Sequence, residues 1–248
     1  MLETRANRIL VVQGRLDVDV IQREQENMRN LAHKSGKHLD FENALSEHAT
    51  TQLDKPDNIL DKYGASIFMG SPNFNLDEST PLRERYVNRV MPLAQKILHE
   101  GEHALGICMG HQVFSSASGV SVRRISEREE IGTVRLHLNK NGQQDPILNG
   151  LPASFKVIAG HNNSVEHTPP GFTQIGETQR DPNSALRKDN VVTFQLHPEI
   201  DEAKELKLRV EASKGTPHEY SETHPFVDPH PATKRIFENF FNQVKKSR

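Results

Sequence analysis

The sequence predicts an α/β fold: a mainly parallel, doubly wound sheet with helices on both faces. Short apolar runs alternate with amphipathic stretches of helical periodicity through the first half of the chain. The length of 248 residues suits one sizeable α/β domain and is ample to bury a core. The sequence contains no internal repeat, low-complexity linker or clear domain boundary, so we expect a single domain over residues 1–248.

The first three elements follow from short stretches near the N-terminus. The run RILVVQ (8–13) predicts a buried strand. Residues 19–36 predict a helix that ends at Gly36. The next strand is ASIFM (65–69), and its end leads into a turn-rich loop, GSPNFNLDESTP.

A long helix and another strand follow. Residues 82–100 have apolar side chains at helical spacing and stop before Gly101. Pro92 lies inside this stretch, so we expect a kink or a break there. The run HALGI (103–107) predicts a buried strand that leads directly into Cys108.

The second half is rich in strands and ends in helices. Between residues 122 and 196 the strand-like runs are TVRLHL, FKVIAG, FTQIGE and VVTFQLH. Helical stretches over 201–213 and 233–246 close the chain, separated by a loop rich in proline and histidine. The side chains in this loop that are able to bind metals are His218, His224, Asp228 and His230. Their irregular spacing and the prolines between them favour a surface loop, so we expect no metal site.

Composition excludes several classes of partner. The net charge is −2 with both signs interspersed, so no electrostatic footprint for nucleic acid or anionic membrane is visible. The first apolar run is too short for a signal peptide, and no later stretch is long enough to span a bilayer. A single cysteine forms no internal disulfide, which fits a reducing compartment. We therefore expect a cytoplasmic protein that binds neither nucleic acid nor membrane.

The only cysteine lies in the pentapeptide G-I-C-M-G. A strand that runs straight into a helix must turn sharply, and glycines at positions 106 and 110 would relieve the crowding. Cys108 would then project from the C-terminal edge of the sheet. Met109 would start the helix, so its N–H and the helix dipole could stabilise a thiolate and an oxyanion. The alternative is a buried structural cysteine, and the pentapeptide alone does not decide between the two.

A thiol nucleophile needs a base, and the base needs a group that orients it. His197 ends the apolar strand in TFQLHPEID, and Glu199 lies two residues further on. Both side chains could therefore share one side of the extended chain. The alternative is a solvated histidine and glutamate at the end of a strand.

These two motifs together resemble the paired signature of the class I (triad-type) glutamine amidotransferases. GICMGHQ and QLHPE occur in the family's order, about ninety residues apart. The segments EIGTVRL, PILNGLPASFKVIAGHNNSV and PPGFTQIG are similar in order to those of GMP-synthase-like amidotransferases. The resemblance covers about residues 8–200 and implies a flavodoxin-like class I amidotransferase architecture, with 201–248 as a C-terminal helical extension.

The resemblance implies a role for each residue of the triad. Cys108 would attack the side-chain amide of glutamine, and His197, oriented by Glu199, would protonate the departing ammonia. Water activated by His197 would then hydrolyse the γ-glutamyl thioester.

The resemblance also implies an oxyanion hole made by the amide of Met109 and one amide from the loop after ASIFM. The family usually has Gly-Gly-Pro in that loop, and here it is Gly70, Ser71 and Pro72. Serine can replace glycine only if the backbone there suits a residue with a side chain.

The substrate contacts rest on two further positions. Gln112 matches a position that helps hold the bound glutamine; the alternative is a polar residue on the exposed face of a helix. The family's Ser-His-Gly-Asp-like segment is here Gly160, His161, Asn162 and Asn163, and we expect the last three of these to contact the substrate.

No motif for activating an acceptor is visible. The sequence has neither the Ser-Gly-Gly-x-Asp-Ser phosphate loop nor a Walker-type loop, so we expect no cofactor. The leading hypothesis is therefore a chain that hydrolyses glutamine and supplies ammonia to a partner synthetase. One alternative is a stand-alone γ-glutamyl hydrolase. Another is a catalytically silent relative that regulates or scaffolds, although the intact cysteine, histidine and glutamate argue against it.

Overall fold

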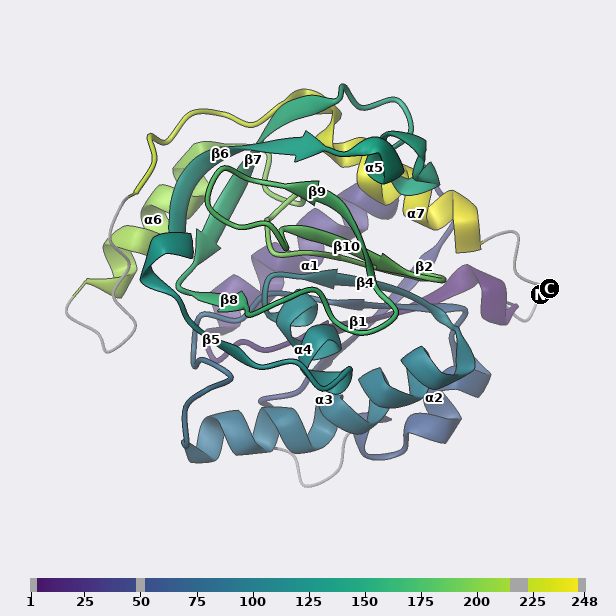
Figure 1. The fold of residues 1–248 in the computed structure, drawn as a ribbon. Helices are drawn as coiled ribbons and strands as arrows, with labels where there is room; N and C mark the ends of the chain where they lie inside the picture. Colours follow the sequence, from purple (N-terminus) through teal and green to yellow (C-terminus); the bar gives the residue numbers. More distant parts are fainter. Residues whose placement is uncertain (1–3, 48–51, 215–222, 245–248) are drawn as a thin grey trace.

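A single large sheet forms the centre of the molecule (Figure 1). The computed structural model describes residues 4–47, 52–214 and 223–244. Within those ranges the sheet has nine strands, in the order β2-β1-β3-β4-β11-β10-β9-β6-β7. The first five are parallel, and each further strand pairs antiparallel with its neighbour. The strands of this sheet are β1 (Arg8–Gln13), β2 (His38–Asn43), β3 (Ala65–Phe68), β4 (His103–Ile107), β6 (Glu130–Leu138), β7 (Ser154–His161), β9 (Thr173–Glu177), β10 (Ala185–Lys188) and β11 (Val191–Phe194).

Helices cover both faces of the sheet, which confirms the predicted fold class (Figure 1). On one face lie α1 (Val18–Ala32) and α7 (Arg235–Val244). On the other lie α2 (Pro56–Lys62), α3 (Pro81–Glu100) and α4 (Met109–Ala117). The antiparallel half carries α5 (Lys140–Gln144) and α6 (Ala203–Ser213).

The first strand shows why the sheet needs both layers. Ile9 and Val11 pack in the apolar cluster that includes α1 and α7, whereas Leu10 and Val12 pack in the cluster that includes α3 and α4. Successive side chains of a strand point to opposite faces, so a continuous apolar run is buried on both sides.

The two long helices differ from prediction at one point each. Helix α1 ends at Ala32 rather than Gly36, because the Ser35 hydroxyl hydrogen-bonds the Ala32 carbonyl (2.6 Å) and turn residues follow. Helix α3 runs unbroken through Pro92, so the expected break is absent. Proline removes the hydrogen bond to the carbonyl of Asn88, but both residues are exposed and water can solvate that carbonyl.

Several short elements escaped the sequence analysis. They are β2, α2, α5, β10 and a two-stranded sheet of β5 (Val122–Arg124) and β8 (Asn163–Val165). Strand β2 pairs only with β1 and buries only Leu39, so it lacks the apolar run that marks a central strand. Its extended conformation comes from pairing with β1 rather than from its own residues.

The described C-terminal residues 223–244 pack against the rest of the fold. Helix α7 places Phe237, Phe240 and Phe241 in the same apolar cluster as Ile9 of β1. The segment before it lies along β6, where the Thr223 and His224 amides donate to the carbonyl of Ile131 (3.1 and 3.0 Å). Within the described residues, no helix is both long enough and apolar enough to cross a membrane.

Candidate active site

Cys108 occupies the turn between β4 and α4. Its φ of 50° and ψ of −100° are unusual for a residue with a side chain. A side-chain carbon at Gly106 would lie 2.9 Å from the carbonyl of Gly110, and one at Gly110 would lie 2.2 Å from the carbonyl of Phe68. Both glycines are therefore needed for close backbone approach. This is the strained strand-to-helix elbow that the pentapeptide predicted.

The predicted oxyanion loop lies directly against the thiol. A side-chain carbon at Gly70 would lie 3.0 Å from Cε1 of His197 and 3.4 Å from Cβ of Cys108. Ser71 has no left-handed backbone angle, so serine fits where the family usually has glycine. Its hydroxyl donates to the carbonyl of Gly14 (2.6 Å) and fixes the loop to the end of β1. As the first residue of α4, Met109 has no acceptor for its N–H within the helix.

His197 and Glu199 form a buried pair beside the thiol. The Nδ1 atom of His197 lies 2.7 Å from Oε1 of Glu199, and each residue is 4% exposed. The alternative of a solvated pair at the end of a strand is therefore wrong. Because a carboxylate only accepts, Nδ1 carries the hydrogen and Nε2 is left for the thiol.

The electrostatics of the three groups favour a thiolate and an imidazolium. Burial opposes ionisation of Cys108, but the charge of His197 and its hydrogen bond outweigh burial, so the pKa of the thiol is lowered. Burial likewise disfavours the charged form of His197, yet Glu199 and Cys108 raise the pKa of His197 to about 9. Such a pair favours the thiolate, which is the nucleophilic form of cysteine.

Gln112 is buried, so the alternative of a polar residue on the exposed face of a helix is wrong. Its amide nitrogen donates to the carbonyl of Asn163 (3.0 Å) and to Oε1 of Gln195 (3.2 Å). Gln195 in turn places Nε2 3.8 Å from Sγ of Cys108. Sequence reasoning missed Gln195, although alternation along the extended chain places it on the same side as His197, two residues later.

The segment His161–Asn163 lies at the end of β7 and the start of β8. The carbonyl of Gly160, just before it, is 3.8 Å from Sγ of Cys108. Asn162 is buried, and its Oδ1 has no hydrogen-bond partner among the described residues. The structure thus brings the residue before this segment to the thiol, and it leaves one buried acceptor within the segment without a partner among the described residues.

Arg15 is a second residue that the sequence analysis missed. It follows β1, is buried, and pairs through Nη2 with Oε2 of Glu24 on α1 (2.5 Å). The same Nη2 is 3.9 Å from where a side-chain carbon at Gly70 would lie. The sequence could have indicated Arg15, because it closely follows a predicted strand and the C-terminal ends of parallel strands meet at one edge of the sheet.

Two of the three described side chains of the C-terminal loop that were considered as metal ligands make other contacts. His218 lies outside the described residues. Nδ1 of His230 accepts from the amide of Ala232 (3.1 Å), and Asp228 accepts from the amide of Ala203 (3.0 Å). In the part of the chain that the structure describes, no group of three His, Cys, Asp or Glu side chains could hold a metal ion.

Comparison with known proteins assigns the chain to a family. The family model "Glutamine amidotransferase class-I" matches residues 21–208. The chain is 32% identical over 138 residues to the glutamine-hydrolysing GMP synthase of Thermosipho melanesiensis, covering 55% of this chain but only 24% of that protein. It is 30% identical over 149 residues to a protein of Sulfurisphaera tokodaii that is named as one subunit of glutamine-hydrolysing GMP synthase, covering 59% of this chain and 73% of the relative.

A solved structure shares the fold. A glutamine amidotransferase from Thermotoga maritima superimposes with a TM-score of 0.71 and 17% identity, over 98% of this chain and 100% of that one. The family match spans most of the chain and includes the thiol elbow and the His197–Glu199 pair. The chain therefore belongs to the class I glutamine amidotransferases.

Proposed function

We propose that this chain hydrolyses glutamine through Cys108 and passes the ammonia to a synthetase partner. The thiolate attacks the side-chain amide carbon, the C–N bond breaks, and His197 protonates the departing ammonia. Water, deprotonated by His197, then attacks the thioester, releases glutamate and restores the thiol. The sum is glutamine plus water giving glutamate plus ammonia.

One observation carries this proposal: the only cysteine is held in a strained elbow beside a buried histidine–glutamate pair. A structural cysteine needs neither the positive φ nor the neighbouring imidazole. We assign the oxyanion hole to the amide of Met109, at the start of α4, and to an amide of the Gly70–Ser71 loop, because Gly70 lies close to Cys108 and His197.

The residues proposed for substrate binding divide into two groups. The open Oδ1 of Asn162 is an acceptor for the α-ammonium group of glutamine. Gln112 uses its amide nitrogen on Asn163 and Gln195, so it acts by holding the Asn163 backbone in place.

The partner is inferred from the relatives. One matching relative is named as one subunit of GMP synthase, and the match to the Thermosipho enzyme covers only 24% of that protein. The sequence contains no recognisable phosphate-binding loop for activating an acceptor. We infer that a synthetase unit outside the sequence described here supplies the activated acceptor.

A direct assay tests the proposal. The purified chain is incubated with glutamine and with a panel of γ-glutamyl peptides and amines, and glutamate and ammonia are measured. We expect glutamate and ammonia in equal amounts from glutamine, and no turnover in Cys108→Ala. Ser116→Ala, on the same helix, is the matched control and should keep wild-type turnover. Undiminished turnover in Cys108→Ala would refute the proposal.

A second candidate, a stand-alone γ-glutamyl hydrolase, has one observation in its favour. The oxyanion loop is already held in place: Ser71 bonds Gly14, Phe74 packs on Tyr86 with ring centroids 4.9 Å apart, and Asp77 accepts from Asn163 (2.6 Å). Fast hydrolysis of γ-glutamyl peptides with no partner present would favour this candidate. Preference for glutamine, with turnover that rises when a synthetase chain is added, supports the amidotransferase.

A further inference from the structure

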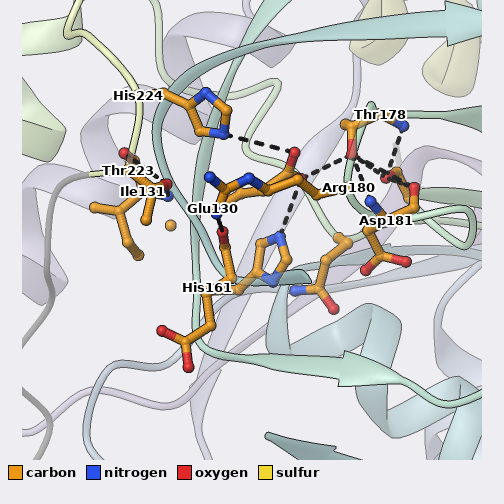
Figure 2. Close-up of polar contacts among 12 residues, drawn as sticks. Glu130, Ile131, His161, Thr178, Arg180, Asp181, Thr223 and His224 are labelled. Atoms are coloured by element: carbon orange, nitrogen blue, oxygen red, sulfur yellow. Dashed lines mark hydrogen bonds and ion pairs between the residues drawn. The ribbon is translucent and has the colours of Figure 1, made fainter. Parts of the chain in front are cut away.

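A carboxylate that the proposed reaction does not use lies buried at the start of β6. Oε2 of Glu130 accepts a hydrogen bond from the Thr178 hydroxyl (2.9 Å) and lies 3.5 Å from Nε2 of His161. Its other oxygen lies 3.9 Å from Nε2 of His224, which comes from the C-terminal segment. Figure 2 shows Glu130 between these three side chains. A buried carboxylate without a cation would be costly, so Glu130 needs a charged partner.

His161 is placed to be that partner. Its Nδ1 lies 3.2 Å from the carbonyl of Asn163, and its Nε2 faces the Glu130 carboxylate. Both neighbours are acceptors, so only the imidazolium, with a hydrogen on each nitrogen, suits both contacts. Burial opposes that charge, but Glu130 and the charge of Asp181 outweigh burial and raise the pKa of His161.

The contrast with His111 shows that burial alone does not produce this state. His111 is equally buried, and its Nδ1 lies 2.9 Å from the hydroxyl of Thr193. Burial, with a smaller contribution from the charge of His161, lowers the pKa of His111 to about 3, so it is neutral. Of these two buried imidazoles, only the one beside Glu130 has a raised pKa.

The charged pair is connected to the thiol. The Asn163 carbonyl that faces Nδ1 of His161 also accepts from Gln112, which bonds Gln195, which reaches Sγ of Cys108. Burial raises the pKa of the Cys108 thiol, and His197 lowers it. The charge of His161 is a further, smaller cause that lowers this pKa. The groups with charge or titrating atoms that face His161 are Glu130, Asp181, Cys108, His111 and His224.

The C-terminal segment covers this pair from the outside. The Thr223 hydroxyl accepts from the amide of Ile131 (2.8 Å), the residue after Glu130. A side-chain carbon at Gly132 would lie 2.2 Å from the carbonyl of His224, so the two backbones are in direct contact. These residues lie beyond the family match, which ends at residue 208.

We propose that Glu130 is a positioning residue that keeps His161 charged and oriented beside Cys108, under a cover made by Thr223 and His224. His161 then acts as a second cation for the thiolate, in addition to His197. The inference rests on the proposed function, because it assigns the pair a role in activating the same nucleophile.

The test measures the thiol directly, with glutamine absent. The rate of alkylation of Cys108 by iodoacetamide is followed against pH in the full chain. We expect Glu130→Gln to raise the midpoint of this profile by about one pH unit, since a lost charge partner shifts a pKa by roughly that much. His161→Gln should raise the midpoint by the same amount. This second variant provides the test if Glu130→Gln does not fold. His111→Gln, which removes a neutral buried imidazole, is the matched control and should leave the midpoint unchanged.

The double variant Glu130→Gln/His161→Gln checks that the two residues act as one unit. We expect it to shift the midpoint no further than either single change. Wild-type midpoints in both single variants, or a fully additive shift in the double, would overturn the inference. An unchanged midpoint in a chain that hydrolyses glutamine would overturn this inference alone. A shifted midpoint in a chain that never hydrolyses glutamine would support it and overturn the proposed function.

Discussion

The backbone of Cys108 stores strain that its neighbours maintain. A residue held in such a conformation costs about 1–3 kcal/mol and persists only where the surroundings fix it. Here the Cys108 amide donates to the carbonyl of Phe194 on β11 (2.7 Å), and its own carbonyl accepts from Gln112 on α4 (3.1 Å). Hydrogen bonds to the sheet and to the helix thus hold Cys108 in this strained conformation, in which its thiol lies beside His197.

The base should matter more than the group that orients it. We predict that His197→Ala lowers glutamine turnover by about 10²–10⁴-fold, because it removes the proton donor for the leaving ammonia. Glu199→Ala should lower turnover only partially, since an imidazole without its carboxylate still samples the productive orientation. Steady-state glutamate release measures both, and wild-type turnover in His197→Ala would exclude the assigned triad.

The pH profile of turnover follows from the same pair. The pKa of Cys108 is lowered and that of His197 is raised to about 9, so both ionised forms coexist between the two values. We predict that turnover falls on the acid side as the thiolate is protonated, and on the alkaline side above about pH 9 as His197 loses its proton. In the denatured chain the thiol should instead titrate near its ordinary pKa of about 8.5. A profile that keeps rising past pH 10 would contradict the assignment of His197 as proton donor.

Among single residues, the sequence predicted the contacts between side chains that lie close together along the chain. The elbow and the His197–Glu199 pair each lie within a few consecutive residues, so their side chains meet by local geometry. Arg15 and Glu130 were missed because their partners lie on other elements: Glu24 on α1 and His161 on β7. No local sequence pattern indicates an ion pair whose two residues are brought together only by the fold.

Among the elements, α1 is tied to the active site by one buried ion pair. Arg15 donates from Nε and Nη2 to Oε2 of Glu24 (3.0 and 2.5 Å), and both residues are buried. Glu24 is a buried residue of α1, like Met28 and Ala32. In the structure it is the residue that neutralises a cation next to the oxyanion loop.

Breaking that pair should destabilise the protein. Glu24→Gln leaves the guanidinium of Arg15 without its counter-charge in a buried site, which costs about 3–5 kcal/mol. Glu26→Gln, an exposed change on the same helix, should stay within about 0.5 kcal/mol of wild type. Denaturant unfolding of the two variants measures the difference, and equal stabilities would show that the pair does not hold α1 in place.

The elements that the sequence predicted are those with a clear apolar pattern, either a continuous run in a central strand or a helical period. Central strands such as β1 and β4, and the amphipathic helix α3, carry that pattern in their own residues. Strand β2 and strand β10 do not, since β2 is an edge and the second half of β10 is only half-buried. Tertiary pairing rather than local propensity determines both.

For the whole molecule, α7 completes the core although it lies beyond the family match. Phe240 is buried in the cluster that also contains Ile9 and Met28. The sequence analysis regarded residues 201–248 as an extension because the resemblance stopped near residue 200. Helix α7, within this stretch, forms part of the layer that covers one face of the parallel sheet (Figure 1).

Truncating that aromatic side chain should therefore affect global stability. Phe240→Ala removes a large buried side chain and leaves a cavity, at a cost of about 3–5 kcal/mol. Asn242→Ala, on the exposed side of the same helix, should change stability by less than about 0.5 kcal/mol. Thermal unfolding compares the two, and equal melting temperatures would show that α7 is dispensable to the core.

The central claim is that Cys108 is a nucleophile activated by the folded site. A chloroketone analogue of glutamine, which alkylates a thiolate that binds its glutamyl part, tests it most directly when combined with peptide mapping by mass spectrometry. We predict a single adduct on Cys108, formed far faster in the folded chain than in the denatured one and slowed by added glutamine. Labelling at equal rates in the folded and denatured chains, or an adduct on another residue, would contradict the claim.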